Sequence, residues 1–173
     1  LDLTRAVGAA VGAELASLGI DLDLGPVADV NSNPDNPVIG TRSFGADPAR
    51  VGRHVAAWVE GLQAEGVAAC VKHFPGHGDT AQDSHLTLPI LAAPADVVRA
   101  RELRPFAAAV AGGAAAVMTS HLLVPALDPD HPATLSAPVL GLLRDELGFD
   151  GAIVSDALDM AGASASRGIP EAA

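Results

Sequence analysis

Apolar residues recur along the chain at two alternating spacings, one typical of helices and the other of short strands. Four segments carry an apolar residue every three or four positions, and this spacing predicts helices over residues 3–18, 47–66, 94–110 and 138–147. Between them lie compact apolar runs, which predict strands over residues 20–24, 67–71, 114–118 and 151–154. Asp47 and Ser136 stand where helix N-caps are expected, and Pro105 is expected to interrupt the third helix.

This alternation of helices and strands predicts an α/β fold with a parallel sheet. Polar residues follow the strand ends, at residues 72–73 after the second strand, 119–121 after the third and 155–156 after the fourth. Chemistry gathered past several strand ends is typical of a (β/α)8 TIM-type barrel, whereas an open sheet commonly binds its ligand beside one glycine-rich phosphate loop. Neither a GxGxxG nor a GxxxxGKS/T motif occurs. We therefore predict a barrel, of which four strands supply only about half.

The pattern also predicts the domain organisation. Residues 1–160 are expected to form the partial barrel, and residues 161–173, rich in alanine, glycine and serine, form a tail without an assignment. The chain begins at Leu1 without a methionine, so we expect it to be a piece of a longer protein.

No apolar run reaches the roughly 18 residues needed for a membrane span. Lys and Arg total 10 against 21 Asp and Glu, and the net charge of −11 argues against nucleic acid or an anionic membrane as the main partner.

The densest polar segment covers residues 72–85, which contain a lysine, three histidines and two aspartates around a proline and two glycines. The glycines and the proline predict a loop. Three roles are open for it: a structural polar loop, proton transfer, or a metal site. Asp83 and His85 are close enough in sequence for the carboxylate to hold an imidazole N–H, which would make the histidine a general acid or base. The candidate metal ligands are His73, His77, Asp79, Asp83 and His85.

Three further residues have both a functional and a structural interpretation. Asp156 follows the fourth strand, where its carboxylate either faces the barrel mouth as a nucleophile or caps the next turn. Arg42 lies in a turn-rich loop, where it either binds substrate hydroxyl groups or pairs with Asp29 or Asp35. His121 is either a neighbour of the site or a hydrogen-bonded structural histidine.

These motifs resemble those of family 3 glycoside hydrolases, specifically of their bacterial β-N-acetylglucosaminidase branch. The segment KHFPGHG over residues 72–78 and the triplet DSH over residues 83–85 resemble the signature of that branch. Three more blocks resemble it in the same order, namely PVADVN over residues 26–31, IGTRSF over residues 39–44 and VSDALDM over residues 154–160. The resemblance covers nearly the whole chain up to Met160.

The resemblance implies a role for each matched residue. Asp156 corresponds to the nucleophile that forms a covalent glycosyl-enzyme intermediate. His85, paired with Asp83, corresponds to the general acid/base. The residues that correspond to hydrogen-bonding groups for the sugar are Arg42, Lys72 and His73. Asp29 is implied to be a supporting acidic residue, and we expect His121 to support the site as well.

The resemblance also implies a reaction. Terminal β-linked N-acetylglucosamine would be hydrolysed from cell-wall fragments or chitooligosaccharides, as in peptidoglycan recycling, without a metal or organic cofactor. The partner would then be a small carbohydrate. The open alternatives are a family 3 β-glucosidase or another exo-β-glycosidase, transfer of the sugar to phosphate, and a non-catalytic sugar-binding relative. Members of the branch occur in the bacterial cytoplasm and at the cell envelope, and neither compartment nor any oligomeric state is favoured here.

We predict that the isolated 173-residue chain does not fold stably, because four barrel strands leave two unpaired sheet edges. The resemblance adds that an acidic, glycine-rich block, which contributes a sugar-binding carboxylate in the family, is not part of this chain. We therefore expect the isolated chain to be inactive as well. Thermal unfolding of the monomeric chain, followed by circular dichroism, is expected to show no cooperative transition, and a cooperative melt contradicts the prediction.

Overall fold

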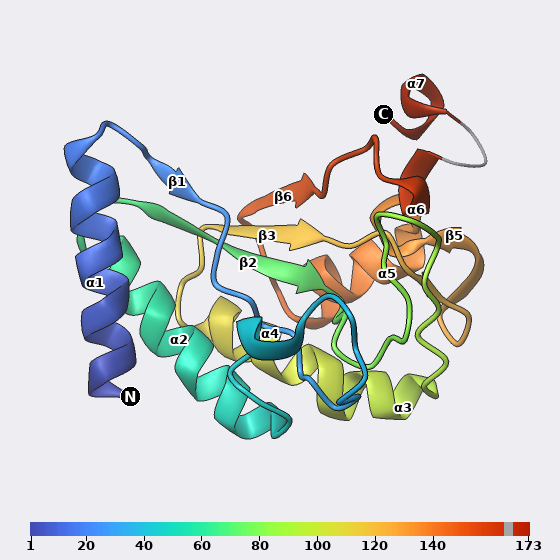
Figure 1. Ribbon diagram of the computed structural model, residues 1–173, viewed down its shortest axis with the longest axis horizontal. Coiled ribbons are helices and arrows are strands. Elements are labelled where there is room, and N and C mark those ends of the chain that lie inside the picture. The colour runs from blue at the N-terminus through green and yellow to red at the C-terminus, as the bar shows by residue number, and fades with distance from the viewer. Residues whose placement is uncertain (165–167) are drawn as a thin grey trace.

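The computed structural model describes residues 1–164 and 168–173 (Figure 1). Its helices are α1 (Asp2–Ser17), α2 (Pro48–Ala64), α3 (Ala95–Val97), α4 (Leu103–Ala111), α5 (Ala137–Gly141), α6 (Ala161–Ser164) and α7 (Ile169–Ala172). Its strands are β1 (Leu22–Asp23), β2 (Ala68–Phe74), β3 (Ala116–Thr119), β4 (Leu123–Val124), β5 (Asp128–Pro132) and β6 (Ala152–Ser155). Short 3-10 turns cover Gly40–Arg42 and Ala133–Leu135, and π-helical turns cover Val98–Glu102 and Leu142–Glu146. Among the described helices, none has both the length and the apolar character needed to cross a bilayer.

Within the described residues, four parallel strands form one sheet in the order β1-β2-β3-β6. Cys70 of β2 lies beside Ala116 of β3, and Thr119 of β3 lies beside Ser155 of β6. Helical segments separate consecutive strands of this sheet along the chain, and Figure 1 shows α2 and α4 on the same side of it. The predicted α/β class with a parallel sheet is confirmed, and the arrangement is that of half a β/α barrel.

The two faces of the sheet are buried differently. On the helix side, Val71 and Val117 belong to the main hydrophobic core together with Val55, Leu62 and Phe106 from α2 and α4. The opposite side carries a separate small cluster made by Cys70, Ala116 and Met118, with Val154 packed against it. In a β/α barrel this second side faces the interior. Because the cluster on the helix side is the larger one, the strands are held mainly by their packing against the helices.

The elements differ from the sequence predictions at several places, among them the first strand, the segment around Pro105 and the pair β4 and β5. The first strand is shorter than residues 20–24, because Gly25 and Pro26 interrupt the ladder, and the chain rejoins β2 through a bridge between Val27 and Lys72. The predicted break before Pro105 is replaced by a π-helical turn that leads into α4. Pro105 lies in the first turn of α4, where the missing proline N–H is tolerated.

The third difference is the antiparallel pair β4 and β5, which the pattern does not predict. The sequence of β5 is DPDHP, and two prolines are typical of a loop or of an edge strand. The tail, residues 161–173, contains α6 and α7, and its residues 165–167 lie outside the described residues.

Helix α1 packs on α2 through glycines rather than through its apolar stripe. Leu3 and Leu18 of that stripe are 77% and 75% exposed, whereas Gly8 and Gly12 are buried. A Cβ atom at Gly8 would lie 2.7 Å from the backbone oxygen of Trp58, and one at Gly61 would overlap the backbone oxygen of Arg5. The two backbones are therefore too close for any larger side chain at these positions.

We predict that Gly61→Ala destabilises the full-length protein that contains this chain by about 2 kcal/mol or more, because α1 must move away from α2. Gly141→Ala is the matched control, since Gly141 ends helix α5 with a helical φ of −60° and its Cβ would lie 3.5 Å from the nearest atom, in Asp145. That substitution is expected to be neutral or to stabilise by up to ~1 kcal/mol. Chemical unfolding measures both, and equal effects would contradict the glycine contact.

Candidate active site

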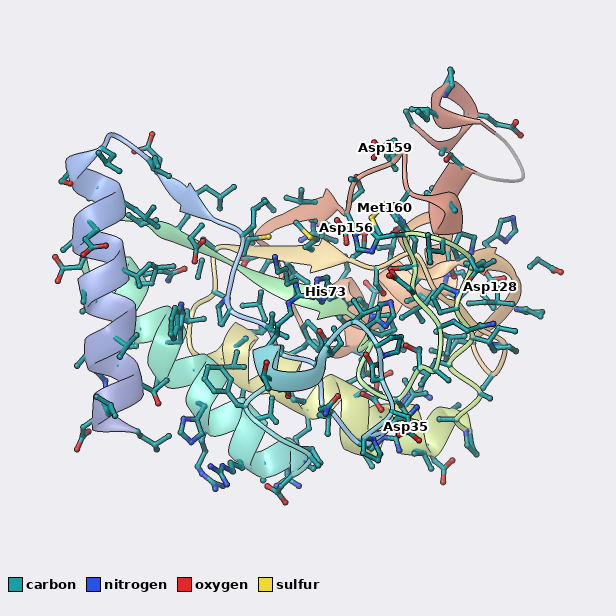
Figure 2. All side chains as sticks on the ribbon, viewed as in Figure 1. Asp35, His73, Asp128, Asp156, Asp159 and Met160 are labelled. Atoms are coloured by element: carbon teal, nitrogen blue, oxygen red, sulfur yellow. The ribbon has the colours of Figure 1, made fainter. Side chains whose placement is uncertain are left out.

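A cavity of about 200 Å³ opens beyond the carboxyl ends of the parallel strands. Figure 2 shows His73 near the end of β2 and Asp156 beyond β6. The lining residues are Val38, Arg42, Lys72, His73, His77, Ser84, His85 and Asp156. They come from segments that are far apart in the sequence, and the parallel strands bring them together because all their carboxyl ends meet at one rim.

Asp29 lies beneath the cavity and is fully buried. Its Oδ2 is 2.7 Å from His73 Nδ1, and its Oδ1 accepts hydrogen bonds from the backbone N–H groups of His77 at 2.7 Å and His73 at 3.3 Å. Burial alone would raise the pKa of Asp29, but the charge and hydrogen bond of His73 and the backbone N–H of His77 outweigh it and lower that pKa. The carboxylate is therefore ionised and only accepts, so His73 carries its proton on Nδ1 toward Asp29.

Lys72 and His73 both line the cavity, although neighbouring residues of a regular strand point to opposite faces. The pairing of β2 with β3 shifts register between Val71 and Phe74, which places both residues inside an irregularity of the strand. Such irregularities re-aim side chains and are frequent beside functional sites.

Asp83 and His85 interact directly on the loop after β2. Asp83 Oδ1 lies 2.7 Å from His85 Nδ1 and also accepts a hydrogen bond from the His85 backbone N–H at 2.9 Å. The backbone hydrogen bond and then the side-chain hydrogen bond of His85 lower the pKa of Asp83. The His85 side chain is 63% exposed, and with Nδ1 directed at Asp83 its Nε2 remains available.

Asp156 is half-buried directly after β6. Its backbone N–H donates to Thr119 O at 3.1 Å, which continues the pairing with β3 by one residue. Its Oδ1 accepts a hydrogen bond from the Ala157 N–H at 2.8 Å. Asp156 therefore both faces the cavity and bonds locally to the following turn, so the two interpretations of this residue are compatible.

Arg42 lines the cavity, whereas His121 is not among its lining residues. Arg42 is exposed, lines the cavity and donates to Val38 O at 3.3 Å, while the oxygens of Asp29 are engaged by His73 and His77. His121 is fully buried. Its Nε2 is 3.0 Å from Ala157 O and its Nδ1 is 2.9 Å from Thr134 Oγ1. His121 thus ties the end of β3 to the residue after Asp156.

The sequence interpretation missed Glu102, which is fully buried beneath the 75–80 loop. Arg101 Nε donates to Glu102 Oε1 at 2.5 Å, and Arg101 Nη2 donates to Asp79 Oδ2 at 2.6 Å. A Cβ at Gly76 would lie 2.7 Å from Glu102 Oε2, so only glycine fits there, and its φ is +137°. The sequence did carry a signal for the burial of Glu102. It stands four residues after Val98 and four before Phe106, and both of these residues lie on the buried helix face.

Two observations concern the candidate metal ligands of residues 72–85. In residues 1–164 and 168–173, no three histidine, cysteine, aspartate or glutamate side chains converge as metal ligands do. The proposed ligand Asp79 instead binds Arg101 and accepts a hydrogen bond from Ser32 Oγ at 2.7 Å. The polar loop therefore has a structural component as well as a cavity-lining one.

We predict that Glu102 makes the stability of the full-length protein depend on pH. Burial, opposed by Arg101, raises the pKa of Glu102 from 4.5 to about 7. Between these values the unfolded chain has lost the proton and the folded chain keeps it, so the free energy of unfolding falls as the pH rises. Relative to Glu102→Gln, the native protein is expected to lose up to about 3 kcal/mol between pH 5 and pH 8.

Urea unfolding at the two pH values measures this difference. Glu65→Gln, at an exposed glutamate, is the control and is expected to follow the native protein. Equal pH slopes for Glu102→Gln and the native protein would contradict the raised value.

Comparison with known proteins identifies the family of this chain. Residues 1–173 match the family model described as Glycosyl hydrolase family 3 N terminal domain. The chain is 45% identical over 171 residues to β-hexosaminidase A of Pseudoalteromonas piscicida, covering 91% of this chain and 29% of that protein. It is 42% identical over 170 residues to β-hexosaminidase LpqI of Mycobacterium tuberculosis, covering 93% and 43% respectively. The chain thus spans less than half of the length of these two relatives.

The fold agrees with a solved structure of the same family. A glycoside hydrolase family 3 β-N-acetylglucosaminidase from Paenibacillus sp. str. FPU-7 superposes with a TM-score of 0.96 at 48% identity, covering 98% of this chain and 33% of that one. The resemblance inferred from the motifs is confirmed. The chain belongs to glycosyl hydrolase family 3, and its residues match the N-terminal domain of that family.

Proposed function

We propose that the full-length protein removes terminal β-linked N-acetylglucosamine from cell-wall fragments or chitooligosaccharides by retaining hydrolysis. The observation that carries this proposal is one cavity lined by both a half-buried carboxylate, Asp156, and a histidine whose Nδ1 faces a carboxylate, His85. A retaining glycosidase needs such a nucleophile opposite a proton donor. The β-hexosaminidase relatives and the β-N-acetylglucosaminidase structure support the choice of sugar.

In the first step, an Asp156 carboxylate oxygen forms a bond to the anomeric carbon while the bond to the leaving oxygen breaks. His85 Nε2 gives its proton to that oxygen, and the hydrogen bond from Nδ1 to Asp83 orients the ring. In the second step, the neutral His85 takes a proton from water as the water oxygen displaces Asp156. The sugar leaves with its original configuration, and both side chains return to their starting states.

The same proposal assigns sugar binding to Arg42, Lys72 and His73. Arg42 and Lys72 present cationic donors to the cavity, and they can donate hydrogen bonds to the oxygens of sugar hydroxyl groups. His73 uses Nδ1 for Asp29, which leaves Nε2 for the substrate. Asp29 supports His73 from below, and His121 supports the turn after Asp156.

We predict that the full-length protein cleaves nitrophenyl β-N-acetylglucosaminide in preference to nitrophenyl β-glucoside. Asp156→Ala is expected to lower kcat by about 10⁴-fold or more, since removal of a covalent nucleophile has effects of that order in other enzymes. Asp159→Ala is the matched control, because it removes an exposed carboxylate three residues further along, and it is expected to keep nearly full activity. Release of nitrophenol gives all rates.

The other outcomes are equally informative. A preference for the glucoside would contradict the assigned sugar but would not affect the role of Asp156 as the nucleophile. Binding of N-acetylglucosamine without turnover of either substrate would contradict the enzyme proposal in favour of a sugar-binding protein. Equal losses for Asp156→Ala and Asp159→Ala would contradict the role of Asp156.

A further inference from the structure

The loop that carries Asp83 and His85 is held at the residue between them. Of residues 83–85, all within the described part of the chain, Ser84 alone is buried, with 4% exposure. Its hydroxyl oxygen lies 3.2 Å from His77 Nε2, and its carbonyl oxygen accepts a hydrogen bond from the Gly162 N–H at 3.1 Å. Ser84 therefore contacts both the segment after β2 and helix α6, which follows Asp156 in the chain.

His77 is itself held at each of its four polar atoms. Its N–H donates to Asp29 Oδ1 at 2.7 Å, and its carbonyl oxygen accepts from Asn36 Nδ2 at 2.8 Å and from Thr80 Oγ1 at 3.0 Å. Its Nδ1 lies 2.7 Å from Thr80 Oγ1, and its Nε2 faces Ser84. His77 is 2% exposed, so the packing around it holds the ring in one orientation.

The bond between Asp83 and His85 cannot position these two residues relative to Asp156. It joins residues two apart on the same loop, so it orients the imidazole only with respect to its own carboxylate. The two side chains are 33% and 63% exposed, and neither exposure implies a fixed place over the cavity. A fixed place requires a contact from this loop to the framework of the site, and Ser84 supplies it.

We propose that His77 and Ser84 are positioning residues that hold the Asp83–His85 pair at the distance from Asp156 at which His85 can protonate the leaving oxygen. This inference rests on the proposed role of His85 as the acid. It gives Asp29 a second task, because the same carboxylate holds His73 by its ring and His77 by its backbone. The sugar-binding histidine and the acid are thus placed by one buried group.

The hydrogen bonds around His77 favour one tautomer of its ring. Burial lowers the pKa of His77, so the neutral ring offers one N–H and one lone pair. Thr80 Oγ1 donates its one hydrogen to His77 O, so it accepts from His77 Nδ1–H, and His77 Nε2 accepts from the Ser84 hydroxyl group. Removing the Ser84 hydroxyl would break the connection to the dyad while leaving Asp83 and His85 in place.

The test compares leaving groups in the full-length protein. A dinitrophenyl β-N-acetylglucosaminide needs little help from an acid, whereas chitobiose needs a proton on its leaving sugar oxygen. Ser84→Ala is expected to lower kcat/KM for chitobiose about tenfold and for the dinitrophenyl substrate less than about twofold, since a misplaced acid costs rate only where the acid is used. His77→Gln, whose amide can still reach Ser84, is expected to fall between native protein and Ser84→Ala.

Two reference variants separate the possible failures. His85→Ala is expected to show the same selective loss in a larger form, and Gln82→Ala, which shortens an exposed side chain on the same loop, is expected to behave as native. A uniform loss for His85→Ala would contradict the proposed acid role and with it the anchor. A selective loss for His85→Ala together with a uniform or absent effect of Ser84→Ala would overturn the anchor alone.

A folding defect does not obscure the result. Thermal melts identify a variant that is destabilised, and a purely structural effect lowers the rates for both substrates in the same proportion. If Ser84→Ala does not accumulate as folded protein, His77→Phe, which keeps a ring but removes the nitrogen that faces Ser84, decides the question by the same ratio of the two rates. A ratio equal to that of the native protein would overturn the proposal.

Discussion

The burial of the Asp29 carboxylate constrains the whole site. An ionised carboxylate without water is strongly unfavourable unless it is paired and hydrogen-bonded, and here three donors from two histidines supply what water would. Those donors fix the strand end at His73 and the start of the loop at His77. Removing any one of them would leave a buried charge partly unsatisfied, so the geometry of the cavity floor and the stability of the fold depend on the same contacts.

Glu102 shows what happens when a buried carboxylate has fewer donors. It receives one ion pair from Arg101, and its Oε2 has no hydrogen-bond partner among the described residues. Burial consequently raises the pKa of Glu102 to about 7, whereas that of Asp29 is lowered. The two groups meet the 75–80 loop at neighbouring positions, Asp29 at the backbone of His77 and Glu102 at Gly76. The loop is therefore supported by one carboxylate that stays ionised and by a second one that titrates near neutral pH.

The cavity combines a rigid floor with an exposed acid. His73 and His77 are 7% and 2% exposed, and both are held by Asp29. His85 reaches the same cavity from a loop on which its side chain is largely exposed. A retaining glycosidase uses its acid and its base function in successive steps, so a histidine with room to adjust, on a loop anchored at one buried residue, suits both.

The sequence by itself determined the main helices, the strands of the parallel sheet, the α/β class and the family, because helix and strand periodicities are local and the motif blocks are contiguous. It also indicated the pairing of Asp83 with His85, since two positions suffice for that contact. Tertiary structure alone decided the burial of Asp29 and the groups that Asp29 and Glu102 hold. Asp29 meets the histidines 44 and 48 residues away, and no spacing along the chain encodes such contacts. The same holds for the burial of Ser84 and for the close approach of α1 to α2 at Gly61, which exist only because packing brings distant backbones together.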